Sequence, residues 1–167
     1  MSKVLAFDTS LSCPGAAIIA VRRRKPKIVA LSHVTTTSRD NHAVRAEQIY
    51  GWVVDLLRVH GKDFDAIVRE DFQGRSSRQN HPVFAAWSAI DRALNAYGLS
   101  FTAPAISQSA VKKTVVGRGK AEKDEVASVV RKLTGYDGEF AVDDESDAAA
   151  VALAWLVREN MIEGVRP

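Results

Sequence analysis

The sequence predicts an α/β protein in which a five-stranded mixed sheet carries helices on both faces. Three observations lead to this prediction. Three apolar runs of strand length follow one another near the N-terminus with short turns between them. Further apolar runs then alternate with segments of helical periodicity, as in strand–helix–strand units. Finally, 167 residues with 46% hydrophobic and 26% charged composition suit a single globular domain over residues 1–167.

The first three predicted strands form an antiparallel meander. They cover residues 3–8, 16–21 and 28–34. Pro14 and Gly15 mark the first turn, and a basic loop over residues 22–27 joins the second strand to the third. Strands joined by such short turns must run in opposite directions. We interpret the basic loop as a solubilising hairpin tip rather than as a binding site.

The rest of the chain alternates helices and strands. A helix over residues 41–60 has an apolar stripe and ends at Gly61. If this helix is a crossover, the fourth strand, residues 64–70, runs parallel to the first. The remaining expected elements are a loop at 72–81, a helix at 82–97, a strand at 99–105, and helices at 107–114, 121–133 and 144–161. Pro82 is expected in the first turn of its helix, where a missing N–H is tolerated.

Four carboxylates stand where structure alone hardly explains an acid. Asp8 ends the first strand, Glu70 ends the fourth, and Asp144 and Asp147 open the last helix one turn apart on one face. Two strand ends and a helix start can converge in an α/β sheet. Converging carboxylates repel each other unless cations bind between them, and hard divalent cations suit phosphoryl chemistry. The pattern predicts metal-dependent cutting of a phosphodiester, with these four acids as catalytic metal ligands.

Simpler explanations exist for each acid. Asp8 could begin a turn, Glu70 could end a strand, and the two helix acids could cap that helix, where acids are favoured. We prefer the catalytic interpretation for the four together. Asp143 and Glu145 should point away if Asp144 points into the site, although Asp143 would replace it as a ligand if the helix begins differently.

Charge and composition narrow the class of protein. The formal net charge is +3, and basic residues crowd loops around an acidic centre, as a nuclease requires. The single Cys13 excludes an intrachain disulfide and fits a reducing compartment. The first apolar run lacks a signal-peptide pattern, and no stretch approaches the roughly 20 apolar residues that span a bilayer. We therefore expect a cytoplasmic protein with no membrane partner.

Four blocks of the sequence stand in a recognisable order and spacing: Asp8-Thr9-Ser10, Arg69-Glu70-Asp71-Phe72, residues 110–123 and residues 144–152. They are similar to the D-P-[GS], E-x-x-F, V-K-x-x-V-x-G-x-G-x-A-x-K and D-x-x-D-A-x-A-x-A segments of the RuvC family of Holliday-junction resolvases. That family belongs to the ribonuclease H-like superfamily. The resemblance covers nearly the whole chain, and the segment 110–123 is quite specific.

The resemblance implies a ribonuclease H-like fold and a structure-selective endodeoxyribonuclease. Such an enzyme cuts Holliday junctions, which are four-way DNA, by paired symmetric nicks as a homodimer. It implies two Mg²⁺ ions per site, with Mn²⁺ as a substitute, and no organic cofactor. The helix 82–97 is the candidate dimer surface. The alternative is a ribonuclease H-like nuclease for other branched DNA, RNA or RNA–DNA hybrids, which would use the same four acids.

The resemblance also implies nucleic-acid contacts. Lys112 and Lys123 resemble the phosphate-binding lysines of the family, although surface lysines on helices are common. Further expected contacts are Ser10, Phe72, Arg75 and Arg78. For the two arginines, a solvated loop is about as good an explanation.

The chain departs from the family pattern at three places, one of which is the loop over residues 74–81, which is unlike the common bacterial form. Thr9 replaces the usual proline. The family's aromatic residue after the catalytic glutamate lies three positions on, where this chain has Gln73, and Phe72 stands one residue early. Whether Phe72 stacks on a base is therefore open. The departures suggest a bacteriophage or an outlying bacterial member of the family.

Overall fold

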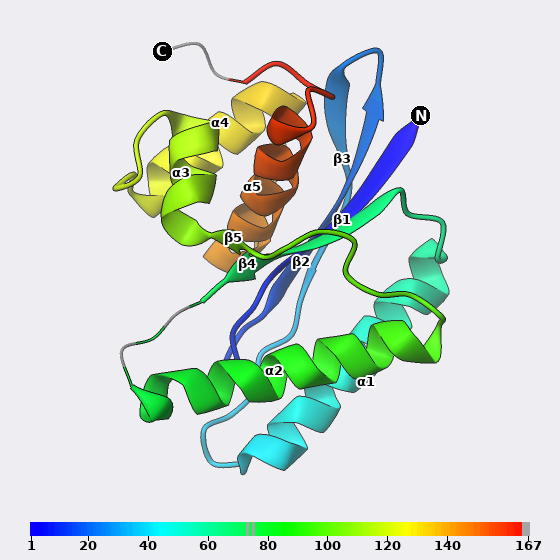
Figure 1. Ribbon diagram of the computed structural model, residues 1–167, viewed down its shortest axis with the longest axis vertical. Helices are drawn as coiled ribbons and strands as arrows, with labels where there is room; N and C mark the ends of the chain where they lie inside the picture. Colours follow the sequence, from blue (N-terminus) through cyan, green and yellow to red (C-terminus); the bar gives the residue numbers. More distant parts are fainter. Residues whose placement is uncertain (73, 75, 165–167) are drawn as a thin grey trace.

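A mixed sheet forms the centre of the computed structural model, which describes residues 1–72, 74 and 76–164. In this part of the chain the strands are β1 Ser2–Asp8, β2 Gly15–Arg22, β3 Lys25–His33, β4 Ala66–Asp71 and β5 Ile106–Ser107. They lie in the order β3-β2-β1-β4-β5 (Figure 1). The first three are antiparallel neighbours, whereas β4 runs parallel to β1 and to β5. The predicted five-stranded mixed sheet with a leading meander is confirmed.

Helices cover both faces of this sheet. Within the described residues they are α1 His42–His60, α2 Ser77–Ala96, α3 Gln108–Val116, α4 Lys123–Thr134 and α5 Asp143–Arg158. Figure 1 shows α1 and α2 together on one side of the sheet and α3, α4 and α5 on the other. The predicted coverage of both faces is confirmed. None of the helices in the described ranges is both long and apolar enough to cross a membrane.

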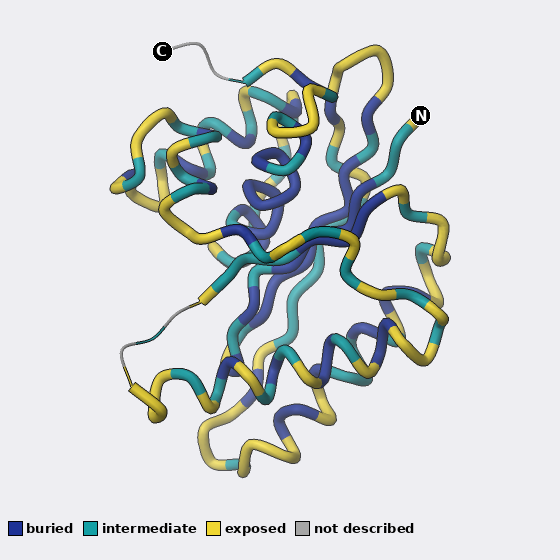
Figure 2. Tube along the Cα trace, in the orientation of Figure 1, coloured by how far each residue is buried: buried dark blue, intermediate teal, exposed yellow. Residues whose placement is uncertain are grey.

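The alternation of side chains along β1 produces two separate cores. Val4 and Ala6 pack on the side of α3, α4 and α5, while Leu5 and Phe7 pack on the side of α1 and α2. All four are completely buried. Both faces of the central strands are therefore buried, and Figure 2 shows these strands as dark tube segments.

The N-terminal end of α5 lies unusually close to the sheet at Gly15. A Cβ at this position would stand 2.1 Å from the backbone oxygen of Asp144, so a side chain there would collide with α5. Gly15 is also the residue that pairs with Asp8 across β1 and β2. The glycine thus allows the first turn of α5 to approach the carboxyl end of β1.

The predicted helix 82–97 begins too late. α2 starts at Ser77, and Pro82 lies inside it. The polar residues between Ser76 and His81 have no apolar periodicity, so a pattern-based prediction assigns them to a loop. Pro82 is the sixth residue of α2, beyond the first turn, so its missing N–H removes one intrahelical hydrogen bond while the helix continues past it.

The predicted fifth strand over residues 99–105 is wrong. β5 consists only of Ile106–Ser107. The preceding segment touches the sheet at Thr102, whose N–H donates to the carbonyl of Ile67 at 2.9 Å and whose Oγ1 accepts from the Ile67 N–H at 2.9 Å. Pro104 then interrupts any ladder because it has no N–H.

The remaining boundaries differ by a few residues at each end. α4 begins at Lys123 rather than at residue 121, because Glu122 and Glu125 form a capping box there. α5 runs from Asp143 to Arg158 instead of 144–161. The one-residue earlier start of α5 leaves Asp144 and Asp147 on the same face of the helix.

Candidate active site

The carboxyl ends of β1 and β4 lie side by side because the two strands are parallel neighbours. Asp8 is the last residue of β1, and Glu70 stands one residue before the end of β4. α5 brings Asp144 and Asp147 to the same edge from above the sheet, guided by its close approach to Gly15. The four acids therefore come from three elements that meet at one edge of the sheet.

Burial, together with the charge of neighbouring acids, raises the pKa of Asp8, Glu70 and Asp147. Part of Asp8 still contacts solvent, but burial raises its pKa well above the usual range, and the charges of Glu70 and Asp147 raise it further. Burial, and next the charge of Asp147, raises the pKa of Glu70 to about 7. Burial also raises the pKa of Asp147, against the opposing charge of Lys123. The edge thus holds more negative charge than its surroundings neutralise.

The oxygen atoms of these four carboxylates suit a hard divalent cation, although the side chains are not clustered tightly. In the described part of the chain, no three His, Cys, Asp or Glu side chains are close enough to form a ready-made metal site. Oxygen-only ligands and uncompensated buried charge are the conditions that favour Mg²⁺ binding. The residues present therefore fit such an ion, with Asp8 central among them.

Two lysines stand beside the acids. The Nζ of Lys123 lies 3.3 Å from Asp143 Oδ2 and 3.8 Å from Asp147 Oδ2. Burial lowers the pKa of Lys123, but its hydrogen bond to Asp143 and the nearby acids outweigh this and leave that pKa raised. Lys112, on α3, and Lys123 both lower the pKa of Glu70, which means that their charges lie near it. The edge thus combines acids with flanking cations.

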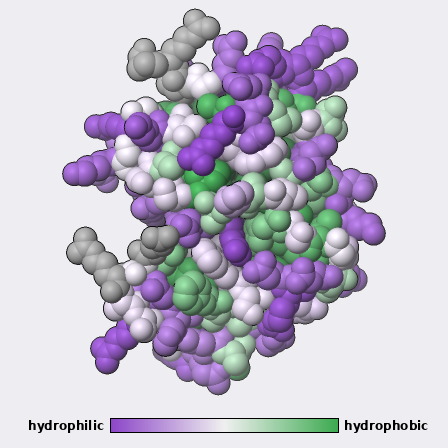
Figure 3. Space-filling view, in the orientation of Figure 1, coloured by the Kyte–Doolittle hydropathy of each residue, from purple (hydrophilic) through white to green (hydrophobic). Residues whose placement is uncertain are grey.

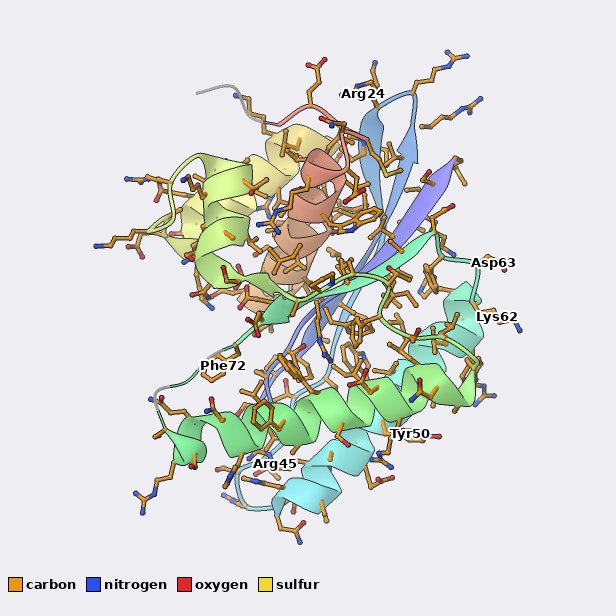
Figure 4. The ribbon with its side chains drawn as sticks, in the orientation of Figure 1. Arg24, Arg45, Tyr50, Lys62, Asp63 and Phe72 are labelled. Atoms are coloured by element: carbon orange, nitrogen blue, oxygen red, sulfur yellow. The ribbon has the colours of Figure 1, made fainter. Side chains whose placement is uncertain are left out.

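A hollow of about 430 Å³ opens beside Glu70. Its lining consists of Glu70, Asp71, Phe72, Ser107, Gln108 and Ser109. The last three belong to the N-terminal end of α3, where free backbone N–H groups favour a phosphate. Phe72 is 39% exposed and lies beyond the end of β4 (Figure 4). The hollow is therefore polar on one wall and aromatic on another.

The other predicted contact residues are more scattered. Ser10 Oγ accepts a hydrogen bond from the Cys13 N–H at 3.0 Å, so it orders the turn that follows Asp8. Arg78 is exposed in the first turn of α2 rather than in a loop. Arg75 lies outside the described residues.

Glu145 forms a buried pair that the sequence does not reveal. Its Oε1 lies 2.9 Å from His33 Nδ1, and its Oε2 accepts from the Ala141 N–H at 2.9 Å. The Glu145 side chain is only 8% exposed, whereas that of Asp143 is 62% exposed. Glu145 therefore ties the start of α5 to the end of β3 and turns away from Asp8. The two partners are 112 positions apart, so no local pattern marks them.

Arg45 is a second residue that sequence reasoning missed. It is 7% exposed, although arginine is rarely buried without a partner. Its Nε donates to Thr36 Oγ1 at 2.8 Å and its Nη2 to Ser12 Oγ at 3.0 Å, while Thr36 Oγ1 donates to the carbonyl of Leu11 at 2.6 Å. Arg45 thereby fixes the loop that follows Asp8 onto α1 (Figure 4 labels Arg45).

Arg69, next to Glu70, connects β4 to α2. Its guanidinium carbon lies 4.0 Å from the ring centre of Trp87 and 4.3 Å from that of Phe101. Its Nη1 is 3.2 Å from Asp91 Oδ2 on α2. A cation held between two rings and a carboxylate has little freedom, so Arg69 restrains the backbone that carries Glu70.

Comparison with known families identifies a match over most of the chain. The model of the family described as crossover junction endodeoxyribonuclease RuvC matches residues 4–155. A crossover junction endodeoxyribonuclease RuvC of Rickettsia bellii is 29% identical over 157 residues, which cover 94% of this chain and 98% of the relative. One from Caldanaerobacter subterraneus is 25% identical over 166 residues and covers 96% of each chain.

Solved structures agree with the sequence relatives. The structure of Thermus thermophilus RuvC has a TM-score of 0.77 and 25% identity, and the match covers 95% of this chain and 97% of that one. T. thermophilus RuvC in complex with a Holliday junction substrate has a TM-score of 0.82 and 24% identity, with 96% of both chains covered.

Proposed function

The chain belongs to the RuvC family of crossover junction endodeoxyribonucleases, and from this premise we propose that it resolves Holliday junctions by paired symmetric nicks. It has the ribonuclease H-like fold that its sequence predicts. As an endonuclease of this family, it hydrolyses phosphodiester bonds in DNA. We also propose that residues 1–167 form one nuclease domain and that the protein acts in the cytoplasm, where DNA is available to it.

One observation carries the proposal beyond family membership. Four acids from β1, β4 and α5 meet at one edge of the sheet, and the pKa of Asp8 and of Glu70 is raised there by burial and by neighbouring carboxylates. A purely structural role does not require four acids to repel one another inside a protein. Nuclease chemistry does, because the acids must hold cations against a phosphodiester.

The acids at this edge would have different roles in holding the cations. The charges of Glu70, Asp147 and Asp144 all act on Asp8, so its carboxylate would help to hold both cations. When bound, two Mg²⁺ ions, for which Mn²⁺ can substitute, would activate water and stabilise the leaving 3′ oxygen. Glu70 would hold one ion, and Asp144 and Asp147 would hold the other. Hydrolysis then adds water across the P–O3′ bond and leaves a 5′-phosphate and a 3′-hydroxyl.

The lysines and the hollow would position the strand that is cut. Lys112 and Lys123 carry positive charge next to the acids and can hold the phosphates on either side of the scissile bond. The hollow beside Glu70 offers the helix N-terminus of α3 to a phosphate and Phe72 to a base. Ser10, Arg75 and Arg78 remain candidate contacts to the DNA backbone.

A homodimer completes the proposal. Symmetric nicks on two strands need two active sites that face them, and a C2 dimer is the simplest arrangement that supplies both. The outer face of α2 is our candidate interface. Phe84 is 51% exposed on it, and its ring centre lies 5.7 Å from that of Trp87. Large apolar side chains at the surface are typical of such contacts.

Asp8→Asn tests the proposed chemistry. An amide keeps the size of the side chain but removes the charge that would hold the cations, so we expect no cleavage of a synthetic four-way junction with Mg²⁺. Binding of the junction should stay the same or become tighter, because the variant removes one repulsive charge. Normal nicking by this variant would disprove the role of Asp8.

The same assay separates the proposal from its alternative. The parent protein is offered four-way junctions, forks, linear duplexes and RNA–DNA hybrids of equal length, with and without Mg²⁺. We expect paired nicks in the four-way junction only. Equal cleavage of the hybrid or of the fork would instead support a less selective ribonuclease H-like nuclease.

A further inference from the structure

The tip of the β2–β3 hairpin carries a cluster of cations far from the acidic edge. The cluster consists of Arg22, Arg23, Arg24, Lys25 and Lys27, all exposed. None of these side chains takes part in the ion pairs found among the described residues. Figure 3 shows strongly hydrophilic surface at this end of the molecule. The cluster therefore presents an excess of positive charge to the solvent.

The hairpin tip also borders a hollow of about 550 Å³. Its other wall is the C-terminal end of α4 around Thr134 and Gly135, together with Glu163, which among the described residues is the one acid in a lining that holds four cations. A Cβ at Gly135 would lie 2.9 Å from the Nζ of Lys27, so this lysine sits at the negative end of the helix dipole, where a cation is favoured. Lys27 thus has a structural explanation. Arg24 has one as well, because its Nη1 donates to the carbonyl of Asn160 just past the C-terminal end of α5. Among the described residues, the side chains of Arg22 and Arg23 have no such partner.

The backbone of the turn is unfavourable for the residues that it contains. Arg22 pairs with Lys25, which leaves a two-residue turn, and both turn residues have positive φ, 52° at Arg23 and 63° at Arg24. Such a turn favours Asn-Gly, because glycine adopts positive φ without strain and asparagine tolerates it better than arginine does. Solubility alone would be served as well by cations on the neighbouring strands. Arginines at both turn positions are therefore strained, and this strain indicates that their positive charge has a function at the tip.

We propose that this hairpin tip binds the phosphate backbone of a duplex arm of the junction, beyond the cutting site. The proposal rests on the proposed function. β2 runs from Gly15, beside Asp8, to Arg22 and has 8 residues. At about 3.3 Å per residue this is about 25 Å, which equals about seven base pairs of duplex. An arm that leaves the acidic edge along the sheet therefore reaches the arginines after about seven base pairs.

The double variant Arg23→Asn/Arg24→Gly removes two positive charges from the tip and is expected to preserve the fold of the hairpin. It installs the residues that the turn favours, so its melting temperature should not fall even though Arg24 no longer donates its hydrogen bond to the carbonyl of Asn160. The matched control is Arg58→Gln/Lys62→Gln, which removes two exposed cations near the end of α1. Figure 4 labels Lys62 there, well apart from Arg24.

Junctions with two arm lengths provide the measurement. One has loop-capped arms of about five base pairs, too short to reach the tip, and the other has arms of about fifteen. The parent should bind the long-armed junction more tightly. The hairpin variant should not show that preference, and its salt dependence on long arms should be flatter by about one unit for each phosphate that the tip no longer binds. The control should keep both the preference and the salt dependence of the parent.

Several outcomes would overturn the proposal. An unchanged affinity of the hairpin variant for long arms would do so, and would favour an acidic protein surface as the partner of the tip. An equal loss of affinity on short and long arms, or an equal loss in the control, would show only a general effect of net charge. Failure of the parent to bind either junction would instead refute the proposed function. That outcome differs from one in which the parent binds both junctions and only the role of the hairpin tip is disproved.

Discussion

Glu70 shows at the scale of one residue how burial and charge change a carboxyl group. Its pKa rises from 4.5 to about 7, first through burial and then through the charge of Asp147. The folded protein therefore binds this proton more tightly than the unfolded chain. The resulting stabilisation is complete below pH 4.5 and is lost as the pH rises through about 7. In buffer without divalent cations, we expect the free energy of unfolding to fall over this window by on the order of 3 kcal/mol.

Denaturant titration between pH 4 and 8 measures this dependence, and Glu70→Gln is its control. The amide cannot titrate, so the variant should show a flatter curve, with the remaining slope due to Asp8 and Asp147, whose pKa values are raised as well. A parent that becomes more stable between pH 4.5 and 7 would contradict the assignment of burial and repulsion to this edge.

The first two turns of α5 allow a comparison of four neighbouring acids. Asp144→Asn and Asp147→Asn should reduce cleavage of a four-way junction by orders of magnitude, because the charges of both acids act on Asp8. Asp143→Asn should retain most cleavage, since its side chain is exposed. Glu145→Gln should cut when folded but unfold more easily by about 1–3 kcal/mol, since it weakens a buried pair with His33.

Initial cleavage rates and melting temperatures of the four variants give the answer together. The inactive variants at Asp144 and Asp147 should melt no lower than the parent without metal, because they relieve repulsion. They should also gain less stability from added Mg²⁺. If Asp143→Asn reduced activity more than Asp144→Asn, the ligand on α5 would be the exposed acid instead.

At the scale of elements, the sequence predicts best where one pattern dominates. β1 and β2 are continuous apolar runs, and α1 has a clear stripe and a glycine stop, so their positions follow from periodicity. The start of α2 and the strand assigned to 99–105 fail for the opposite reason. The residues of α2 before Pro82 are polar and mostly exposed, so they carry no apolar stripe, and Pro104 restricts β5 to two residues.

At the acidic edge, too, some residues could be predicted from a local sequence pattern and others could not. Asp8 and Glu70 could be predicted because each interrupts a buried run at a strand end, and parallel strands align such ends. Their support could not, because Arg45 and Glu145 act through partners that are distant in sequence. Arg69 likewise depends on rings brought by α2 and by the segment before β5. Such contacts arise from the fold and have no local signature.

Gly15 offers a direct test of how β2 positions α5. Gly15→Ala would put a Cβ 2.1 Å from the backbone oxygen of Asp144, so the start of α5 must move. We expect a loss of stability on the order of 2–3 kcal/mol and a larger loss of cleavage than of junction binding. Thermal melting and single-turnover cleavage measure the two effects.

Gly51→Ala is the matched control for that substitution. Gly51 lies inside α1, and a Cβ there would meet nothing within 4 Å. The alanine should therefore raise stability by about 0.5–1 kcal/mol through helix propensity and leave cleavage unchanged. If the two variants behaved alike, close packing at Gly15 would not be what holds Asp144 in place.

In the whole molecule, the acidic edge lies between two helical layers that contribute to it in different ways. The layer of α3, α4 and α5 supplies acids and lysines directly. The layer of α1 and α2 supplies supports, since Arg45 fixes the loop after Asp8, and Trp87 and Asp91 hold Arg69 beside Glu70. A partner bound to the outer face of α2 would therefore contact the same helix whose Trp87 and Asp91 hold Arg69 next to Glu70.

This link makes the proposed dimer surface testable through both assembly and cutting. Phe84→Asp places a charge on the exposed apolar face of α2, which should convert a dimer into monomers in sedimentation velocity. With one active site per bound particle, a junction labelled on both cut strands should show single nicks instead of paired ones. Val59→Asp is the control, because Val59 is an exposed apolar residue on α1 that is 76% accessible. It should remain dimeric and cut in pairs, and a Phe84→Asp protein that also stayed dimeric would move the interface away from α2.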